Sequence, residues 1–172
     1  MRLIYAGILF TSLLTWLPVS GNLLAEETVE LSPKDKLVVE TLLRLKSFDL
    51  DSSAPAKAAV LRYLRAKPGT DRSFELIERF KPVEIAGQLT KYSLAHPGET
   101  GGVRAAELLF AMNRGGSLSA YINSENEPEA VSAVELIGHA AGKQTVPLLL
   151  PVVSEGKASA TVRSTAVKAL GT

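Results

Sequence analysis

Cysteine is absent from the 172-residue chain. This absence excludes disulfides, thiolate metal sites and covalent attachment of c-type haem within the chain. Aromatic residues are also scarce, at 6%, whereas Ala and Leu are plentiful. A β-sandwich favours aromatic and β-branched residues, so this composition suits thin layers of packed helices better. Without disulfides, such layers must be held together by packing alone.

Charge is almost absent from the first 25 residues, where Arg2 is the only charged side chain. Residues 3–19 form a largely apolar run, which Pro18 and the small residues after it interrupt. A basic start, an apolar middle and a small residue at the exit are typical of a secretory signal peptide. The sequence therefore predicts a signal peptide over residues 1–25, with cleavage near Ala25, and a secreted or periplasmic protein.

An uncleaved N-terminal membrane anchor is the alternative interpretation. The uncharged stretch 3–25 is about long enough to span a bilayer. Against an anchor, no basic cluster follows this stretch, and the next charges are Glu26, Glu27 and Glu30. We assign residues 26–31 to a short acidic linker and expect no stable membrane insertion once the signal peptide is cleaved.

A large charge of either sign is also missing. Cleavage after Ala25 removes one of the 19 Lys and Arg residues and none of the 18 Asp and Glu residues, so the mature chain is formally neutral. A nucleic-acid partner would require a basic stripe that replaces the counterions of the phosphates. Neutrality therefore argues against nucleic acid, and it gives no reason to expect tight binding to anionic membranes.

Helix signals follow from residue 32 onward. Ser32 and Pro33 are typical of an N-cap and a first helical residue, and Leu37, Val38, Thr41, Leu42 and Leu45 follow at helical spacing. Residues 99–102 are expected to form a flexible connection. The predicted helices cover approximately 33–48, 54–67, 71–81, 82–95, 103–113, 118–122, 128–141, 145–155 and 158–170. Pro151 makes residues 148–153 ambiguous between a kinked helix and a strand, and we favour the helix because nothing supplies a pairing strand.

One sequence pattern recurs along the chain. Residues 133–138 read Ala-Val-Glu-Leu-Ile-Gly, and residues 166–171 read Ala-Val-Lys-Ala-Leu-Gly, 33 positions later. A looser copy begins at Ala105, 28 positions before the first. Repetition at this period is typical of stacked helical hairpins. We therefore expect an all-α fold, a right-handed α-solenoid over residues 32–172, with the clearest repeats over 103–172.

The C-terminal region resembles the HEAT repeats of the short, PBS-lyase-like type. Val162-Arg163, Ala166 and Ala169-Leu170-Gly171 are similar to the second helix of such a repeat, and residues 138–150 are similar to the turn and inner helix, through Gly138, Gly142, Val146, Pro147, Leu149 and Leu150. The resemblance covers residues 128–172. It implies that Ala allows close helix approach, that Gly ends a helix, and that Arg or Asp joins successive repeats.

A narrower resemblance is to large secreted bacterial proteins in which helical repeats join a dehydrogenase-like β-propeller to a c-type cytochrome. It involves residues 39–45, 58–61 and 145–150. The haem attachment motif Cys-x-x-Cys-His and all propeller features are absent from this sequence. The resemblance therefore implies a repeat module alone, or the repeat portion of a truncated periplasmic electron-transfer protein with its haem domain downstream.

No catalytic, cofactor-binding or metal-binding residue is predicted. His96 and His139 lie near predicted helix ends without acidic partners of metal-site spacing. The acidic groups at 26–30 and 125–129 lie in a linker and a loop, and Ser119, Ser124 and Ser132 lack a nucleophile-elbow motif. Gly98, Gly101 and Gly102 follow no strand, as a phosphate loop would require. A bilin-lyase-like or hydrolytic activity, known for some repeat proteins, lacks a nucleophile or base here.

The concave face of a helical solenoid is a common binding surface. Candidate residues for a peptide groove are Arg62, Tyr63, Arg65, Tyr92, Arg104 and Tyr121. The alternative is that these side chains cover the helical hairpins with their apolar parts. The sequence thus predicts a non-catalytic, exported scaffold without a cofactor, whose partner is another protein or an adjacent domain.

Overall fold

The computed structural model describes residues 31–171, so the predicted signal peptide and residues 26–30 of the predicted linker lie outside the described residues. Every regular element of the described part is helical. The α-helices are α1 (Pro33–Arg44), α2 (Ala54–Ala66), α3 (Asp71–Phe80), α4 (Ala86–Ala95), α5 (Thr100–Ala111), α6 (Gly116–Ser119), α7 (Glu127–Ala140), α8 (Thr145–Ser154) and α9 (Ala160–Leu170). Short 3-10 helices are η1 (Leu50–Ser52), η2 (Val83–Ile85), η3 (Ala120–Asn123) and η4 (Gly142–Gln144).

Local capping signals explain where several helices begin. The side chains of Ser32, Ser53, Thr70 and Ser159 each accept a hydrogen bond from the backbone N–H three residues later. Such caps satisfy N–H groups that have no partner inside the helix. The predicted start at Ser32 and Pro33 is confirmed.

The buried face of α1 differs from the predicted one. Leu37 is 68% exposed and Leu45 is also exposed, whereas Val39 is fully buried and Leu42 nearly so. The cause is the position of α2, which contacts α1 on the side of Asp35, Val39 and Leu42. The spacing of apolar residues predicts that α1 is a helix, but it does not determine which side of α1 packs against α2.

Residues 99–102, expected as a flexible connection, belong largely to α5, which begins at Thr100. Gly102 is buried, and a Cβ atom there would collide with the backbone carbonyl of His96. Gly101 lies against the Tyr92 hydroxyl, at 2.9 Å from the position of its absent Cβ. The glycines therefore allow α4 and α5 to approach closely, which explains why they are compatible with a helix.

The predicted helix around Pro151 is confirmed, because α8 runs through this residue. Pro151 has no N–H to donate within the helix, and its ring crowds the preceding turn. The residue is exposed. Water can therefore hydrate the backbone at this position.

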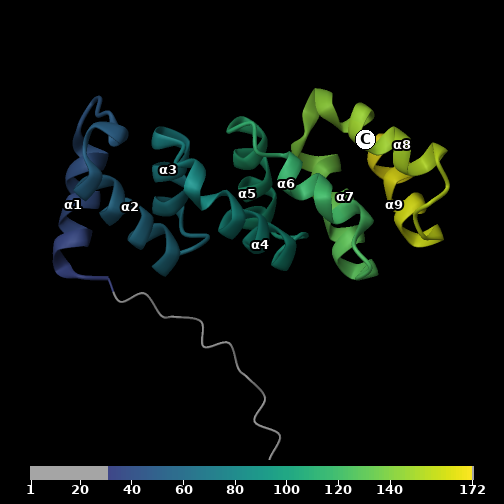
Figure 1. The fold of residues 1–172 in the computed structure, drawn as a ribbon, viewed down its shortest axis with the longest axis horizontal. Coiled ribbons are helices and arrows are strands. Elements are labelled where there is room, and N and C mark those ends of the chain that lie inside the picture. Colours follow the sequence, from purple (N-terminus) through teal and green to yellow (C-terminus); the bar gives the residue numbers. More distant parts are fainter. Residues whose placement is uncertain (1–30, 172) are drawn as a thin grey trace, which may run out of the picture.

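The helices follow one another along the long axis of the molecule (Figure 1). Consecutive helices form hairpins, with α1 against α2, α4 against α5 and α8 against α9. The odd-numbered helices also contact each other in turn, α3 with α5, α5 with α7 and α7 with α9. We call α1, α3, α5, α7 and α9 the odd row. Within residues 31–171, no helix combines the length and apolar character that crossing a membrane requires.

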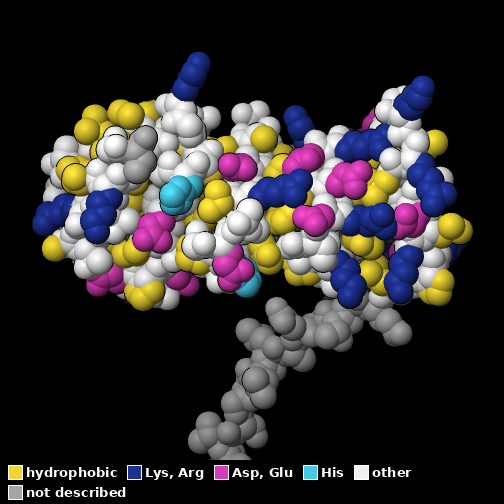
Figure 2. Space-filling model, turned by 180° about the vertical axis from the view of Figure 1, so that it is seen from behind, with side chains coloured by type: hydrophobic (Ala, Val, Ile, Leu, Met, Phe, Trp, Pro, Cys, Tyr) yellow, Lys and Arg dark blue, Asp and Glu magenta, His cyan; other side chains and the backbone are white. Residues whose placement is uncertain are grey.

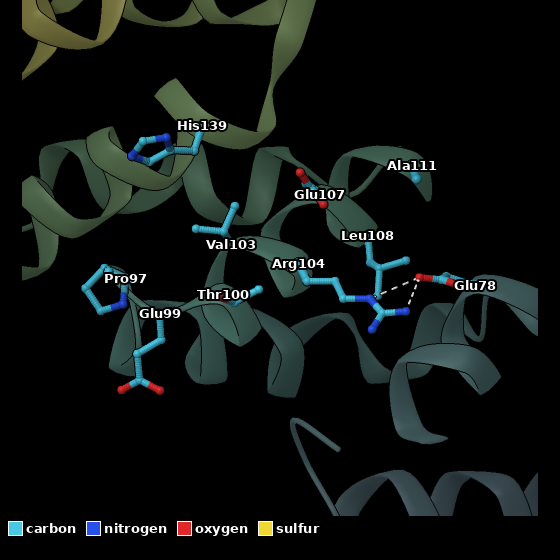
Figure 3. A pocket seen from close by; sticks show the side chains of 11 residues that line it. Glu78, Pro97, Glu99, Thr100, Val103, Arg104, Glu107, Leu108, Ala111 and His139 are labelled. Atoms are coloured by element: carbon cyan, nitrogen blue, oxygen red, sulfur yellow. Dashed lines mark hydrogen bonds and ion pairs between the residues drawn. The ribbon is translucent and has the colours of Figure 1, made fainter. Parts of the chain in front are cut away.

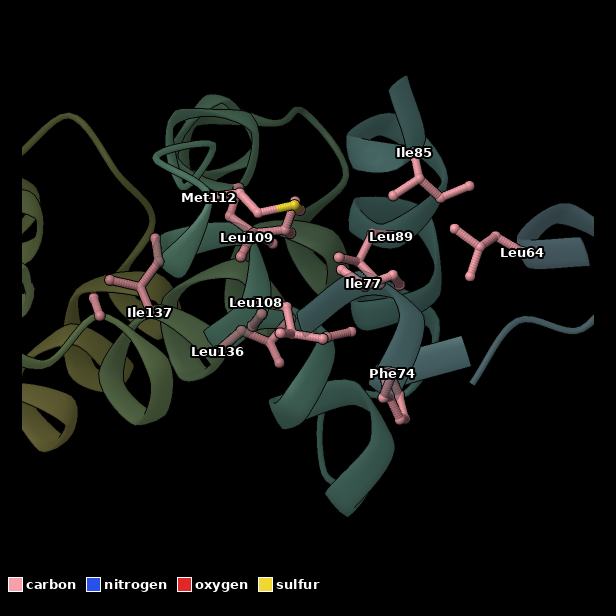
Figure 4. Packing of buried hydrophobic residues seen from close by; sticks show 14 of the residues in the cluster. Leu64, Phe74, Ile77, Ile85, Leu89, Leu108, Leu109, Met112, Leu136 and Ile137 are labelled. Atoms are coloured by element: carbon pink, nitrogen blue, oxygen red, sulfur yellow. The ribbon is translucent and has the colours of Figure 1, made fainter. Parts of the chain in front are cut away.

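The core runs along the row of helices, between members of the odd row as well as between them and the other helices. Figure 4 shows Leu64 of α2 facing Ile85 and Leu89, while Leu109 of α5 and Met112, directly after α5, lie near Ile137 of α7. Small residues bring α7 and α9 close together, since a Cβ at Gly138 would lie only 2.7 Å from the Cβ of Ala169. The recurring motif at 133–138 and 166–171 therefore includes the contact between these two helices.

Candidate interaction surface

A groove of about 560 Å³ lies along α5, between α3 and α7 (Figure 3). Its apolar lining includes Pro97, Val103, Leu108 and Ala111, and Thr100 at the start of α5 also lines it. The acidic and basic side chains that line it are Glu78, Glu99, Arg104 and Glu107, and the imidazole of His139 also lines it. An apolar strip with charged groups on both sides is suited to an extended protein segment.

A second groove, of about 220 Å³, lies between α7 and α9. Glu135, Gly138, His139 and Lys168 are among the residues that line it. His139 borders both grooves. The two grooves therefore lie next to each other along the odd row and form one surface, which we call the odd-row groove.

Arg104 is the residue that joins α3 to α5 beside the groove. Its guanidinium donates to Glu78 Oε1, at 3.2 Å from Nε and 2.8 Å from Nη2. It also lies 3.6 Å from Asp71 and 4.9 Å from the centre of the Phe74 ring. A cation held by two carboxylates and an aromatic face is well fixed in position.

Acid–base pairs recur between successive members of the odd row. Glu40 of α1 pairs with Arg72 of α3, and Glu78 of α3 pairs with Arg104 of α5. The next acid and base along the row are Glu107 and His139, followed by Glu135 and Lys168; they line the two grooves, and no ion pair joins either acid to its base among the described residues. We call these four pairs the acid–base ladder.

Ion pairs are formed in the first half of the acid–base ladder and not in the second half. Ion pairs join the helices at Glu40–Arg72 and Glu78–Arg104. Among the described residues, neither Glu107 and His139 nor Glu135 and Lys168 form such a contact with each other. The odd-row groove is therefore bordered by the polar side chains of Glu107, Glu135, His139 and Lys168, which a partner could contact.

Arg62, one of the six residues predicted for a peptide groove, is paired with a carboxylate of the first hairpin. Its guanidinium donates to both carboxylate oxygens of Asp35, at 3.0 and 2.5 Å. This hydrogen bonding by Arg62, together with that of Ser32, lowers the pKa of Asp35 from 3.8 to about 2. The pair joins α1 to α2, which gives Arg62 a structural contact in the hairpin.

Tyr92 is brought to Arg104 through a shared aromatic neighbour. The Tyr92 ring meets Phe74 edge-on at 6.4 Å, and Arg104 covers the same Phe74 ring. Tyr92 also lies 4.6 Å from the ring of His96, whose Nδ1 is 3.0 Å from Glu99. These contacts join α3, α4 and the start of α5 below the groove.

The structure does not assemble the six predicted residues into one groove. Only Arg104 lines the odd-row groove, and Tyr92 is adjacent to it through Phe74. Tyr63 and Arg65 lie on α2, the former half-buried and the latter exposed, and Tyr121 is half-buried in η3. Sequence reasoning did not place Glu107 and His139 in the surface. Their separation of 32 positions, equal to that of Glu40 and Arg72, was the available signal.

Other polar contacts join the even-numbered side of the molecule. Lys57 of α2 contacts Asp51 at 2.7 Å and Glu84 of η2 at 2.5 Å. The hydrogen bonds that Lys57 donates to the carboxylates of Asp51 and Glu84 raise the pKa of Lys57, and the bond to Glu84 lowers the pKa of Glu84. Thr90 of α4 shares a hydrogen bond of 2.7 Å with Ser117 of α6. Contacts of this kind hold one helix pair on the next.

His96 and His139 lie on different helices or loops, and no group of three His, Cys, Asp or Glu side chains in residues 31–171 is placed to hold a metal ion. Comparison of the chain with protein-family models, curated proteins and solved structures gives no match. Any function must therefore be argued from the surface itself.

Proposed function

We propose that this chain is an exported, non-catalytic α-solenoid of HEAT-like repeats that binds a segment of another protein in the odd-row groove. The observation that carries the proposal is the continuity of two grooves through the shared His139. Repeat proteins commonly bind partners along a surface built from equivalent helices. The period of 33 residues and the odd row support the assignment to this architecture.

The chemistry of the groove favours an extended protein segment. The groove offers apolar contact through Val103, Leu108 and Ala111. It also contains the side chains of Glu107 on α5 and His139 on α7, which can form hydrogen bonds with a partner. Figure 3 shows Arg104 directed toward Glu78, so this cation is already engaged. The partner would therefore be held by apolar contacts and by polar groups that complement Glu107 and His139.

Photo-crosslinking in the native host tests this proposal. A photoreactive amino acid at Ala111, which is exposed in the groove, is expected to give one discrete protein adduct. The same amino acid at Gly87, which has open space around it on α4, is the matched control and is expected to give none.

A substitution of Glu107, at the edge of the groove, provides a second test. The substitution Glu107→Lys should reduce the yield of the adduct at Ala111 by about tenfold, because it reverses the charge of this side chain at the edge of the groove. The free energy of unfolding should change by less than about 0.5 kcal/mol, since Glu107 is exposed. Equal adducts at Ala111 and Gly87, or an adduct indifferent to Glu107→Lys, would contradict binding in the odd-row groove.

A further inference from the structure

Carboxylates outnumber cations in the larger part of the odd-row groove, the part of about 560 Å³ along α5. Glu78, Glu99 and Glu107 line this part, and Arg104 is the only Lys or Arg among the described residues that line it. The guanidinium of Arg104 is already shared by Glu78, at 2.8 Å, and by Asp71 beside the groove, at 3.6 Å. This part of the groove is therefore negatively charged, and it stays so when the imidazole of His139 is protonated.

Glu107 lacks the basic neighbour that an acid at the start of the acid–base ladder has. Arg72 of α3 forms an ion pair with Glu40 of α1, which lies 32 positions earlier. At the same separation from Glu107 the chain has His139, whose side chain is shorter than that of Arg and is charged only when protonated. Within residues 31–171, Glu107 forms no ion pair. Its carboxylate is therefore left for a cation that a partner supplies.

A second acid lies at a defined distance from Glu107. Glu99, directly before α5, Val103 and Glu107 are four residues apart in turn, and all three line the groove. Figure 3 shows Val103 between the two acids. Because a helix rises about 1.5 Å per residue, the two acids are about 12 Å apart along the axis, with the apolar side chain halfway.

This spacing matches that of an extended chain. Side chains on the same side of such a chain are two residues apart, and each residue advances the chain by about 3.3 Å. Side chains at positions one, three and five are therefore spread over about 13 Å. A basic, an apolar and a second basic side chain at these positions would face Glu99, Val103 and Glu107 in turn.

The three side chains are accessible to such a segment. The side chain of Glu99 is 67% exposed, Glu107 is exposed and Val103 is half-buried. Glu99 contacts the imidazole of His96 through Oε1, at 3.0 Å. A carboxylate has a second oxygen and further acceptor capacity, so this contact leaves Glu99 able to accept from a partner's cation.

The chain itself does not supply this pattern. No two Lys or Arg residues of the sequence are four positions apart, so neither a segment of this chain nor a second copy offers two basic side chains at the required spacing. The stretch 26–30 contains three Glu residues, which the carboxylates of the groove would repel. The charge and the spacing together select another protein as the occupant.

We propose that the part of the odd-row groove along α5 binds an extended segment of a partner protein with the pattern basic-x-apolar-x-basic, where the basic residues are Lys or Arg. One basic side chain pairs with Glu107 and takes the place that Arg72 has beside Glu40. The apolar side chain covers Val103, and the second basic side chain pairs with Glu99. This inference rests on the function proposed above, because it names the chemistry of the segment that the groove binds.

Three labelled peptides and the full chain provide the experiment. The first peptide contains Lys-Gly-Leu-Gly-Lys between Ser residues, the second has Glu in place of each Lys, and the third has the composition of the first with the two Lys adjacent. Fluorescence anisotropy at low ionic strength measures binding, since salt screens exposed charges. The first peptide is expected to bind at least about tenfold more tightly than the second and at least about threefold more tightly than the third.

Substitutions locate the binding in the groove. Glu107→Lys should weaken binding of the first peptide by about tenfold. His139→Arg should weaken it by about threefold or more, because it introduces a guanidinium that competes for Glu107 as Arg72 engages Glu40. Glu75→Lys is the matched control, since Glu75 is an exposed acid of α3 outside the groove lining, and it should leave the affinity unchanged. Circular dichroism verifies the helical content of each variant.

Several outcomes would overturn the basic pattern. They are equal affinity for the first and second peptides, equal affinity for the first and third, no binding of any peptide, and binding that survives Glu107→Lys. A dimer in sedimentation analysis that Glu107→Lys disrupts would assign the groove to a second copy of this chain. If any of these results occurs while the photoreactive residue at Ala111 still gives a discrete protein adduct, the groove binds a partner of other chemistry. Absence of that adduct contradicts binding in the groove itself.

Discussion

Asp35 is the only charged side chain that is buried among residues 31–171. It faces Arg62, so the α1–α2 hairpin contains a carboxylate that must stay ionised in the folded state. Its pKa is lowered to about 2, below the ordinary value of 3.8. A group of this kind stabilises the fold above its unfolded pKa and loses that contribution as the pH falls toward its folded pKa.

The Asp35→Asn variant should therefore show a pH-dependent deficit in stability. At neutral pH it should have a lower Tm than the unmodified chain, because Arg62 loses its anionic partner. The difference should narrow as the pH falls from about 4 to about 2, where the native carboxylate also becomes protonated. Thermal unfolding followed by circular dichroism across this range measures the effect.

Glu75→Gln provides the matched control, since Glu75 is an exposed acid on α3. Its Tm should follow that of the unmodified chain at every pH. If the deficit of Asp35→Asn is the same at pH 7 and at pH 2, the ion pair with Arg62 is not its source.

At the scale of the helix, two glycines in neighbouring elements have opposite surroundings. Gly102 in α5 packs on the backbone of His96, whereas Gly87 in α4 has open space where a side chain would be. Gly102→Ala should lower the free energy of unfolding by about 1–3 kcal/mol, because a methyl group must push two helices apart. Gly87→Ala should raise it by up to about 1 kcal/mol through better helix propensity.

Urea denaturation of both variants gives the comparison. The opposite signs matter most, because both substitutions add the same methyl group to a helix. Equal effects at the two positions would mean that the close approach of α4 and α5 does not limit the size of residue 102.

The sequence predicts helix ends better than helix faces. Ser32 and Ser53 mark their helices through local hydrogen bonds, which depend only on nearby residues. The exposure of Leu37 instead of Val39 depends on where α2 lies, and spacing along α1 does not contain that information. Likewise, Gly101 and Gly102 indicate a loop by propensity, but packing against α4 makes them helical.

The candidate surface was predictable only in part for the same reason. Arg104 is one of the six residues that the sequence predicts for a peptide groove, and it lines the odd-row groove. Glu107 and His139 line the same groove because α5 and α7 are neighbours, although 32 positions separate them. Recognising the acid–base ladder requires the helix order first, since each single pair resembles ordinary surface charge.

For the molecule as a whole, charge is distributed unevenly along the axis. Residues 31–81 contain eleven Lys and Arg against seven Asp and Glu, whereas residues 82–171 contain seven against eight. Figure 2 shows the corresponding concentration of basic side chains over the N-terminal half of one face. A partner that binds both halves would therefore need a matching gradient of charge, more acidic toward α1.

The predicted export concerns the entire chain and has a direct test. Cleavage after Ala25 should leave a mature protein that begins at Glu26 and is found in the secreted or periplasmic fraction. N-terminal sequencing of the protein recovered from each fraction measures this. Recovery of a membrane-bound form that retains residues 1–25 would support the anchor instead. Replacing Leu9 and Leu13 by Arg should block export, because it interrupts the apolar run.

The helix order also determines how the chain can fold. Arg79 donates to the Leu43 carbonyl across 36 positions, and the elements in extensive contact are close along the chain, α4 with α7 being the most widely separated pair. Short loops close at a small entropic cost, and a low contact order favours rapid folding. Each hairpin can therefore dock on its predecessor as soon as the ribosome or a translocation channel releases it. Assembly can proceed from the N-terminus without waiting for the C-terminal helices.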